Sequence, residues 1–425
     1  MSSALPKVMA CAPAQEPLRI GVVYSRLPFP MMRGDQTTVA HLISFLTARG
    51  HELDLYALSS GGALTPEQDE WLRSSCRKVH LYDHGPVRKI LGLVAGLSRL
   101  RPMQVSIFTN RQLRRDLERV ARDGDLDILY CYYPRTSLDM PTTSTAGRPA
   151  SYLALQLSQT LNTRRMAQHE RNLLKRAVFS IEARLMARFE ARIWRRFRRV
   201  VLIGPEDVRA VRAQCAAYGQ PEIDNWIYGP HGTDTERFNA ADPTEIVPDR
   251  VVFSGSMSYP PNVQAVEWFV AHVWPLVRLE VPEASLMIQG RDPARSVQRM
   301  HGRDGIVVTG TVPDVGEIIR SAQVCVNPML AAGGMQNKLI EYMASGKAIV
   351  ASSVANEGIM APDDVLVIAD TADEFARAVL DLLSDSRRAL ALGTRAREYA
   401  LSDWTWEKHF LDLEAAFVAD ARAAS

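Results

Sequence analysis

Short apolar runs alternate with amphipathic stretches along the chain. In the first half, runs at 18–24 and 52–57 are typical of buried strands, and residues 37–49 between them have the apolar spacing of a helix. A further helix at 111–122 precedes a strand at 126–132. A strand, a loop, a helix and a second strand form a βαβ unit, which predicts a parallel sheet.

The same alternation begins again near residue 250. It predicts strands at 250–254, 285–289, 306–309, 324–327 and 348–351, with helices at 262–278, 338–345, 372–384 and 387–399. We therefore expect two doubly wound α/β halves, with a boundary in the polar stretch 238–249, which holds two prolines. Ligands of such sheets bind beyond the carboxyl ends of the strands, so two facing domains would enclose a cleft.

The composition narrows the class of protein. The chain has 425 residues, 47% hydrophobic and 23% charged, which is typical of a globular protein of two or three domains. A net charge of +2 argues against a general polyanion binder, and five scattered cysteines without C-x-x-C spacing favour a reducing cytoplasm. The sequence holds no apolar run of 18 residues, no H-E-x-x-H metal spacing, no G-x-S-x-G and no P-loop.

The strongest candidate site lies between residues 327 and 351. A strand ends there in a loop of small residues that includes Gly333 and Gly334, and a helix follows with Lys338 and Glu341 on one face. Glycines allow a close backbone approach, and the N-terminus of a helix favours an anion such as a diphosphate. Lys338 could add a positive charge, and Glu341 could hold a ribose diol. The alternative is a glycine-rich turn beside a surface Lys–Glu pair.

Two further strand ends in the second half have the same form. The run FSGSMSYPPN enters a turn at Gly255 and Ser256, and the next helix is expected to be capped by Asn262. Gly290 and Arg291 follow the next strand, and Arg291 could reach a phosphate. Either loop could instead be a tight turn without a ligand.

The first strand leads into the loop LPFPMMRGDQTT. Gly34 and Asp35 stand at the start of the first helix, where a sugar or phosphate could approach. Asp35 could equally be an N-cap, and Arg33 is expected to be a solvated side chain.

Two basic stretches could contact other molecules. Residues 164–199 hold 12 Lys or Arg and 3 Glu, with apolar residues three or four apart from Leu174 to Phe197. This spacing predicts one or two amphipathic helices packed by their apolar stripe, with a basic face for an anionic bilayer, a phosphate-bearing acceptor or solvent. The aromatic side chains do not alternate with the arginines, so no nucleic acid is expected. Residues 87–100 are expected to form a buried helix, with contact at a membrane interface as the alternative.

The chain resembles the glycosyltransferases of family 4, and most closely the branch that assembles bacterial exopolysaccharide. In the second half the resemblance rests on the stretches FSGSMSYPPNVQAVEWF, LMIQGRDPARSVQ, VVTGTVPDVGEIIRSAQVCVNPML, GGMQNKLIEYMASGKAIVAS and DWTWEKHF. In the first half it rests on LPFPMMRGDQTTVAHLISFL, LRPMQVSIF, EARLMARFEARIWRRFRRVVLIGPED and GPHGTDTERFNA. It therefore covers nearly the whole chain from Leu18 onward.

The resemblance implies the GT-B fold, in which two Rossmann-like domains face each other across a cleft. We expect a tail at 1–17, an acceptor domain at 18–240, a nucleotide-sugar domain at 250–400 and a C-terminal helix at 401–425 that packs back on the first domain. Lys338 and Glu341 would contact phosphate and ribose, and both are expected to be catalytic together with Asp35. The remaining donor-side residues would be Gly255, Ser256, Arg291, Gly310, Val312, Gly333, Gly334 and Met335, with Gly34 and Asp35 on the acceptor side.

Three positions depart from the family pattern. Members commonly carry a Glu-x7-Glu pair, but here Gly333 stands eight residues before Glu341. The loop Ser256–Tyr259 lacks the usual Arg and Lys, and the stretch CYYPRTS after the strand ending at Tyr132 lacks a His. Retaining transfer tolerates the missing base, because positive charge and backbone N–H groups stabilise the leaving group.

The implied activity is transfer of a sugar from a nucleotide-sugar donor to a glycan, a lipid-linked molecule or a small molecule. It would proceed with retention and without metal or cofactor, in the cytoplasm or at the inner face of the membrane. Two alternatives stay open. One is a nucleotide-sugar epimerase or phosphorylase on the same fold, and the other is a sugar-binding or membrane-docking module whose catalytic machinery has decayed.

Overall fold

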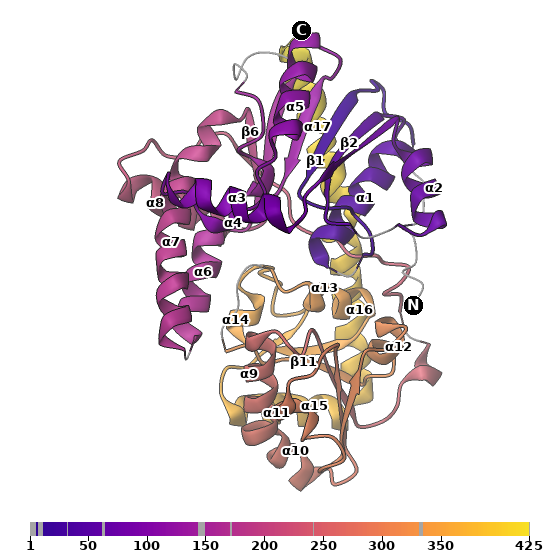
Figure 1. Cartoon of the computed structure of the whole chain (residues 1–425). Helices are drawn as coiled ribbons and strands as arrows, with labels where there is room; N and C mark the ends of the chain where they lie inside the picture. Colours follow the sequence, from indigo (N-terminus) through magenta and orange to yellow (C-terminus); the bar gives the residue numbers. More distant parts are fainter. Residues whose placement is uncertain are drawn as a thin grey trace. The chain divides into compact units, whose positions relative to one another are not determined.

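The computed structural model describes residues 6, 12–31, 33–61, 64–142, 149–170, 172–240, 242–330 and 335–424. The chain divides into two compact units (Figure 1). Unit 1 comprises residues 1–230 and 409–425, and unit 2 comprises residues 231–408.

Unit 1 is built on a seven-stranded sheet with the order β3-β2-β1-β4-β5-β6-β7, in which every pair of neighbours is parallel. The strands are β1 (Arg19–Tyr24), β2 (Glu52–Ser59), β3 (Lys78–Asp83), β4 (Ile128–Tyr132), β5 (Ala150–Gln156), β6 (Arg199–Leu202) and β7 (Trp226–Tyr228). The helices are α1 (Gly34–Ala48), α2 (Pro66–Ser75), α3 (Pro86–Leu97), α4 (Met103–Ser106), α5 (Arg111–Asp123), α6 (Gln159–His169), α7 (Leu173–Ile193) and α8 (Pro205–Ala217). The order reverses beside β1, so the carboxyl ends of β1 and β4 flank the topological switch point.

The last helix, α17 (Trp406–Ala423), completes unit 1 from its residue 409 onward. Phe417 packs against the rings of Tyr130 and Tyr152, with centroids 5.6 and 4.7 Å away. Asp420 accepts a hydrogen bond from the Tyr152 hydroxyl at 2.6 Å and pairs with Arg199 at 2.8 Å. The final residues are thus fixed to the sheet through buried aromatic contacts and a carboxylate.

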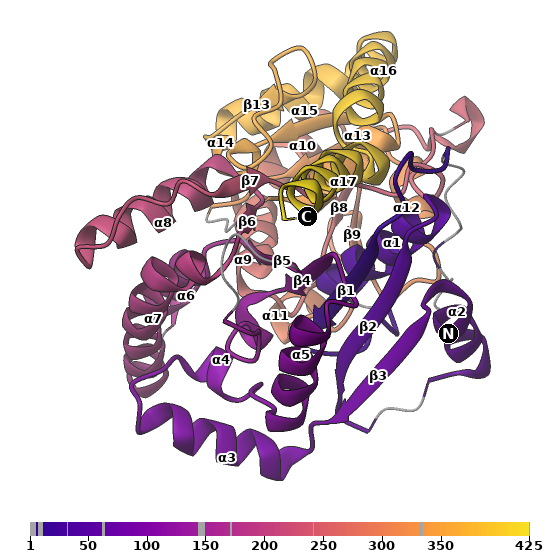
Figure 2. The same ribbon diagram turned by 90° about the horizontal axis from the view of Figure 1, so that it is seen from above.

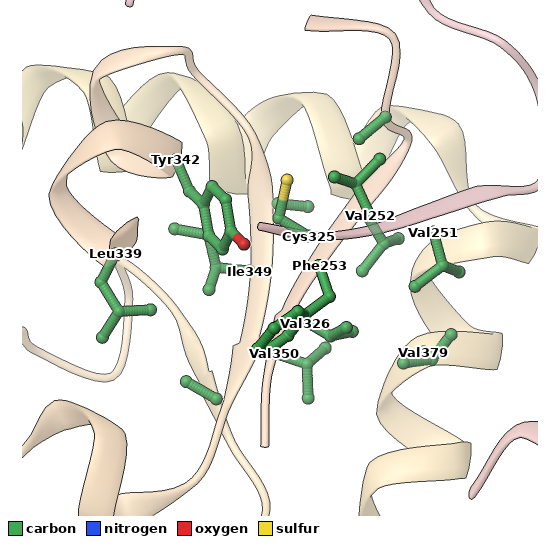
Figure 3. Packing of buried hydrophobic residues seen from close by; sticks show 14 of the residues in the cluster. Val251, Val252, Phe253, Cys325, Val326, Leu339, Tyr342, Ile349, Val350 and Val379 are labelled. Atoms are coloured by element: carbon green, nitrogen blue, oxygen red, sulfur yellow. The ribbon is translucent and has the colours of Figure 1, made fainter. Parts of the chain in front are cut away.

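Unit 2 has a six-stranded parallel sheet with the order β10-β9-β8-β11-β12-β13. The strands are β8 (Arg250–Ser254), β9 (Ser285–Gln289), β10 (Ile306–Gly310), β11 (Val324–Asn327), β12 (Ala348–Ala351) and β13 (Val367–Ile368). The helices are α9 (Pro260–Trp268), α10 (Trp274–Glu280), α11 (Arg295–Gln298), α12 (Val315–Arg320), α13 (Asn337–Ala344), α14 (Ser353–Asn356), α15 (Ala372–Ser384) and α16 (Ser386–Asp403). Figure 3 shows the core of this unit, where Val326 and Val350 lie beside Phe253.

The predicted α/β class with two doubly wound parallel sheets is confirmed. The expected strands at 250–254, 285–289, 324–327 and 348–351 have the bounds of β8, β9, β11 and β12. The chain passes between the units before His231, ahead of the polar stretch 238–249. Thr233 bridges to Thr405 and Phe238 is buried in the core of unit 2, so this segment already belongs to the second unit.

The prediction that Asn262 caps the helix after β8 is wrong. The helix α9 begins at Pro260, with Tyr259 as its N-cap, so Asn262 lies within the first turn. Two prolines fill the first two helical positions, where a missing N–H costs nothing. The side chain of Asn262 is therefore free to make other contacts.

The expectation of a buried helix at 87–100 is also wrong. Helix α3 buries only Gly92 and Gly96, whose Cα atoms approach Ser106 of α4 so closely that a Cβ would overlap it. Because the helix packs through its glycines, its apolar side chains face solvent. More than half of the surface is exposed at each of these residues of α3 and the segment just after it: Val87, Ile90, Leu91, Val94, Leu97 and Leu100. Figure 2 shows α3 on the outer side of unit 1.

The basic segment 164–199 forms the two helices α6 and α7, and its apolar stripe is only half buried. Leu174 and Ile181 are 77% and 56% exposed, whereas Ile193 and Phe197 lie in the core. The buried face of α7 carries mainly small residues and two glutamates: Glu182, Ala183, Met186, Ala187, Glu190 and Ala191. Glu182 accepts hydrogen bonds from the first backbone N–H groups of α4, which explains its burial. No helix in the described ranges is long and apolar enough to cross a membrane.

Candidate functional site

The candidate residues of unit 2 gather at the carboxyl edge of its sheet, where the loops after β8, β9, β10 and β11 emerge. Helix α13 follows β11 and is tied to β8 by Tyr342. The hydroxyl of Tyr342 accepts a hydrogen bond of 2.7 Å from the backbone N–H of Ser254. Figure 3 shows Tyr342 and Leu339 reaching from α13 into the core. This packing fixes the outer face of α13, which carries Lys338 and Glu341.

Lys338 is buried rather than on the surface. Its ammonium nitrogen donates a 2.7 Å hydrogen bond to Asn262 Oδ1 and lies 4.3 Å from the centroid of the Phe253 ring. Burial lowers its pKa to about 7, against a small opposing effect of Glu341. The side chain of Lys338 is thus buried, so the alternative of a surface Lys–Glu pair is wrong.

Asn262 joins the loop after β8 to Lys338. Its amide nitrogen donates to the backbone carbonyl of Ser256 at 3.0 Å, while its oxygen accepts from Lys338. Gly255 has φ +150°, and a Cβ there would lie 2.8 Å from Asn262 Nδ2 and 3.3 Å from Lys338 Nζ. Position 255 therefore requires glycine, both because of its positive φ and because a Cβ would crowd Asn262 and Lys338. The sequence pattern predicts Asn262 only as a helix cap and does not indicate its contact with Lys338.

The loop after β9 packs directly on the loop after β8. A Cβ on Gly290 would overlap the carbonyl oxygen of Gly255, and the N–H of Met257 donates to the carbonyl of Arg291 at 3.1 Å. The Arg291 side chain is half-buried and makes no hydrogen bond or ion pair within the described residues. Its guanidinium is therefore a cation without a partner among the described residues, on a loop whose backbone contacts Gly255 and Met257.

Glu341 lies one turn beyond Lys338 and is half-buried. Burial raises the pKa of its carboxyl, and the positive charges of Arg237 and Lys338 act in the opposite direction. Arg237 belongs to the segment before β8, and its guanidinium lies over the ring of Phe238. Sequence patterns do not indicate this arginine, because it lies far from Glu341 along the chain and only the fold brings the two together.

The remaining donor-side residues lie along the same edge. Gly310 ends β10 with φ +67°, and no atom lies within 4 Å of the position of a Cβ there. Val312 follows in the loop to α12, and Met335 is half-buried just before α13. Gly333 and Gly334 lie outside the described residues.

Gly34 and Asp35 begin helix α1 in unit 1. Arg33 is the N-cap and its side chain makes no capping bond, so Asp35 is not the N-cap. The Asp35 carboxylate instead lies among three arginines, with Arg33 at 3.3 Å, Arg26 at 3.5 Å and Arg135 at 3.7 Å. Arg33 is thus engaged with Asp35 although its side chain is 55% exposed.

The arrangement in unit 2 suits an anion that carries a sugar diol. A buried lysine, an unpaired arginine and glycine-lined backbone form the surroundings that a diphosphate favours, and a carboxylate nearby can accept two hydroxyl hydrogen bonds. Within the described ranges no group of three or more His, Cys, Asp or Glu side chains is placed to hold a metal ion.

The chain is similar in sequence to known glycosyltransferases. Residues 248–385 match the family model described as glycosyl transferases group 1. Phosphatidyl-myo-inositol mannosyltransferase of Mycolicibacterium smegmatis is 25% identical over 394 residues, which cover 90% of this chain and 89% of that protein. GDP-mannose-dependent alpha-(1-6)-phosphatidylinositol monomannoside mannosyltransferase of the same organism is 31% identical over 202 residues, 42% of this chain and 52% of that protein.

Solved structures share the fold. Sucrose-phosphate synthase from Thermosynechococcus elongatus superposes with a TM-score of 0.63 at 16% identity, covering 96% of this chain and 100% of that one. HepE of Anabaena in complex with UDP-glucose gives a TM-score of 0.60 at 12% identity, covering 95% and 100%. WaaG, a glycosyltransferase involved in lipopolysaccharide biosynthesis, gives 0.59 at 14% identity, covering 93% and 99%.

Proposed function

We propose that this chain, which is a family 4-like glycosyltransferase with the GT-B fold, binds a nucleotide-sugar donor at the carboxyl edge of the unit 2 sheet. The observation that carries the proposal is the buried Lys338, held beside Gly255 by the neutral amide of Asn262. A neutral partner leaves the positive charge uncompensated, so a diphosphate gains from entering the site.

Each donor group has a matching protein group. Lys338 and Arg291 would contact the diphosphate, together with the backbone of Gly255, Gly333 and Gly334. The carboxylate of Glu341 would accept the hydroxyls of the ribose. The base would lie beside Gly310 and Val312, and the sugar beside Met335 and Ser256.

The proposed step is transfer with retention and without a bound metal. As the bond between sugar and diphosphate breaks, negative charge grows on the leaving diphosphate. The ammonium group of Lys338 and nearby N–H groups stabilise this charge, so they lower the barrier more than they strengthen ground-state binding. Asp35 and Gly34 are assigned to the acceptor side.

The acceptor is proposed to be lipid-linked, which would place the enzyme at the inner face of a membrane. Two of the relatives are named for phosphatidylinositol-based acceptors, which supports a lipid over a small molecule. None of the relatives described above is an epimerase or a phosphorylase.

Unit 1 has a surface suited to anionic bilayers. Next to the exposed apolar face of α3 lies a pocket of about 250 Å³ between the segment 99–102 and α7. Its walls are apolar side chains and five arginines, with no carboxylate: Arg99, Arg101, Arg188, Arg192 and Arg196. We assign α3 to the acyl boundary and the arginines to lipid phosphates, a combination typical of peripheral membrane proteins.

The test is a mass-spectrometric screen of nucleotide sugars against the full-length protein. We expect one nucleotide sugar to bind and to be hydrolysed slowly without acceptor, because water can replace the missing acceptor. A panel in which no nucleotide sugar binds would contradict the proposal. Binding without turnover on any acceptor would instead favour the decayed sugar-binding module.

A further inference from the structure

Arg26, Arg33 and Arg135, here called the arginine cluster, surround the carboxylate of Asp35 in unit 1. Arg26 follows β1, Arg135 lies in the turn after β4, and Arg33 is the N-cap of α1. Since β1 and β4 are neighbours in the parallel sheet, the cluster stands at the switch point of that sheet. Counting the described residues, three positive charges meet one negative charge there, so two charges stay uncompensated.

The contacts within the cluster leave hydrogen-bond donors unused. Within the part of the chain that the structure describes, Arg33 Nε donates a hydrogen bond to Asp35, whereas Arg26 Nε and Arg135 Nη1 approach its carboxylate only at 3.5 and 3.7 Å. Both nitrogens are buried and have no hydrogen-bond partner among the described residues. The hydroxyl of Ser25, next to Arg26 in the chain, is likewise buried without a described partner. A buried donor without an acceptor costs free energy, which a ligand oxygen would recover.

The environment of Arg135 also points to a ligand. Its side chain is 18% exposed, and its guanidinium lies over the rings of Tyr133 and Phe108, 4.9 and 5.2 Å from their centroids. Burial, and to a smaller extent the positive charge of Arg26, lower the pKa of Arg135. Tyr133 has φ +76°, a strained angle for a tyrosine that turns the chain toward Arg135.

We propose that the arginine cluster binds the phosphate or diphosphate group of the acceptor, and that Asp35 positions the arginines. The planar forks of arginine suit phosphate oxygens, and two uncompensated charges match a phosphate dianion. This inference rests on the proposed function, which assigns the donor diphosphate to unit 2 and leaves an anion site in unit 1 for the acceptor. The acceptor would then be a phosphorylated molecule rather than a neutral glycan.

Titration calorimetry with inorganic pyrophosphate on the full-length protein tests the inference. The Lys338→Ala background removes the donor lysine, and we expect pyrophosphate binding to unit 1 to persist in it. Arg26→Gln and Arg135→Gln in this background should each weaken that binding by about 10- to 100-fold, the loss of one charge-assisted contact. Arg119→Gln is the matched control, because this arginine of unit 1 is 65% exposed and pairs with Asp116.

The variant Arg135→Lys distinguishes a loss of phosphate contacts from a loss of folding. This variant keeps the charge without the fork, so it should bind pyrophosphate more tightly than Arg135→Gln. The inference would be overturned if the Lys338→Ala protein bound pyrophosphate as tightly with Arg26→Gln or Arg135→Gln as without them. It would also be overturned if Lys338→Ala alone abolished all pyrophosphate binding. If Arg119→Gln weakened pyrophosphate binding as much as the cluster variants do, the effect would be one of overall charge, and the inference would also be overturned.

The same variants separate this inference from the proposed function. Slow donor hydrolysis without acceptor depends on unit 2 and should continue in the control variant Arg119→Gln. Absence of donor hydrolysis in the wild type, with an intact pyrophosphate site in unit 1, would contradict the proposed function and leave the anion site standing. A neutral acceptor used as well as its phosphorylated form would overturn the acceptor assignment.

Discussion

The ammonium group of Lys338 lies 2.7 Å from the carboxamide oxygen of Asn262. The two residues belong to different strand–helix connections, 76 positions apart in the chain. An amide orients the lysine as a carboxylate would, but it does not neutralise the charge. The consequence is a cation that is buried, fixed and available to a phosphate.

Proton uptake should accompany donor binding. Burial lowers the pKa of Lys338 to about 7, so most of the free protein carries a neutral lysine at pH 8. A bound diphosphate favours the charged form and raises this pKa, so binding at pH 8 takes up about one proton and weakens as pH rises further. Calorimetry in two buffers of different ionisation enthalpy measures the uptake. Lys338→Met is the control, and an unchanged uptake in it would refute the assignment to this lysine.

Glu341→Gln should weaken binding of the free nucleotide by about 1.5–3 kcal/mol, because the amide cannot accept two charge-assisted hydrogen bonds from the ribose. The fold should be retained, since the carboxyl is half-buried and makes no hydrogen bond within the described residues. Titration of wild type and variant with the nucleoside diphosphate measures the effect. Glu317→Gln, on the exposed side of α12, serves as the control. Wild-type affinity in Glu341→Gln would show that the ribose lies elsewhere.

Gly255→Ala should disrupt the donor site. A Cβ would press on Asn262 Nδ2 at 2.8 Å, and the positive φ adds backbone strain of about 1–3 kcal/mol. Gly124→Ala provides a matched control, because Gly124 also has a positive φ but its Cβ would meet no atom within 4 Å. Both variants should lower the midpoint of thermal unfolding, and only Gly255→Ala should lose donor affinity. Equal donor affinity in the two variants would argue against the role of this loop.

The α3 face should mediate membrane binding. Ile90→Asp with Val94→Asp should abolish cosedimentation with vesicles containing phosphatidylglycerol, because two exposed apolar side chains can no longer enter the acyl boundary. Leu279→Asp, at a site 76% exposed on α10 of unit 2, is the control. Salt should weaken wild-type binding, because the neighbouring arginines act through screened charges. Binding that ignores lipid charge and salt would contradict this assignment.

The regular parts of the fold could be predicted from the sequence because each strand is a short apolar run. The bounds of β8, β9, β11 and β12 follow directly from that pattern. Helix α3 could not be placed this way, since its packing depends on the approach of Gly92 and Gly96 to another helix. Apolar spacing cannot distinguish a helix that buries its large side chains from one that buries its glycines.

The site could be predicted in part for a similar reason. Lys338 and Glu341 lie three residues apart on the helix that follows a glycine loop, so their closeness in space follows from the sequence alone. Asn262 and Arg237 are far from Lys338 and Glu341 in the sequence and come close to them only in the folded chain. Spacing along the sequence therefore does not predict these two neighbours. The arginines around Asp35 come from two strand ends and a helix start, and only sheet order brings them together.

The rate at which nucleoside diphosphate is released from the nucleotide sugar, in wild type and in Lys338→Ala, tests the central claim most directly. Lys338 stabilises charge that grows as the sugar leaves, so its removal should lower kcat much more than it weakens donor binding. Leu279→Ala, on the exposed side of unit 2, should match the wild type. We expect a fall in kcat of about 10²- to 10³-fold, the size typical of losing one stabilising group. An unchanged kcat, or a loss confined to donor affinity, would contradict the account.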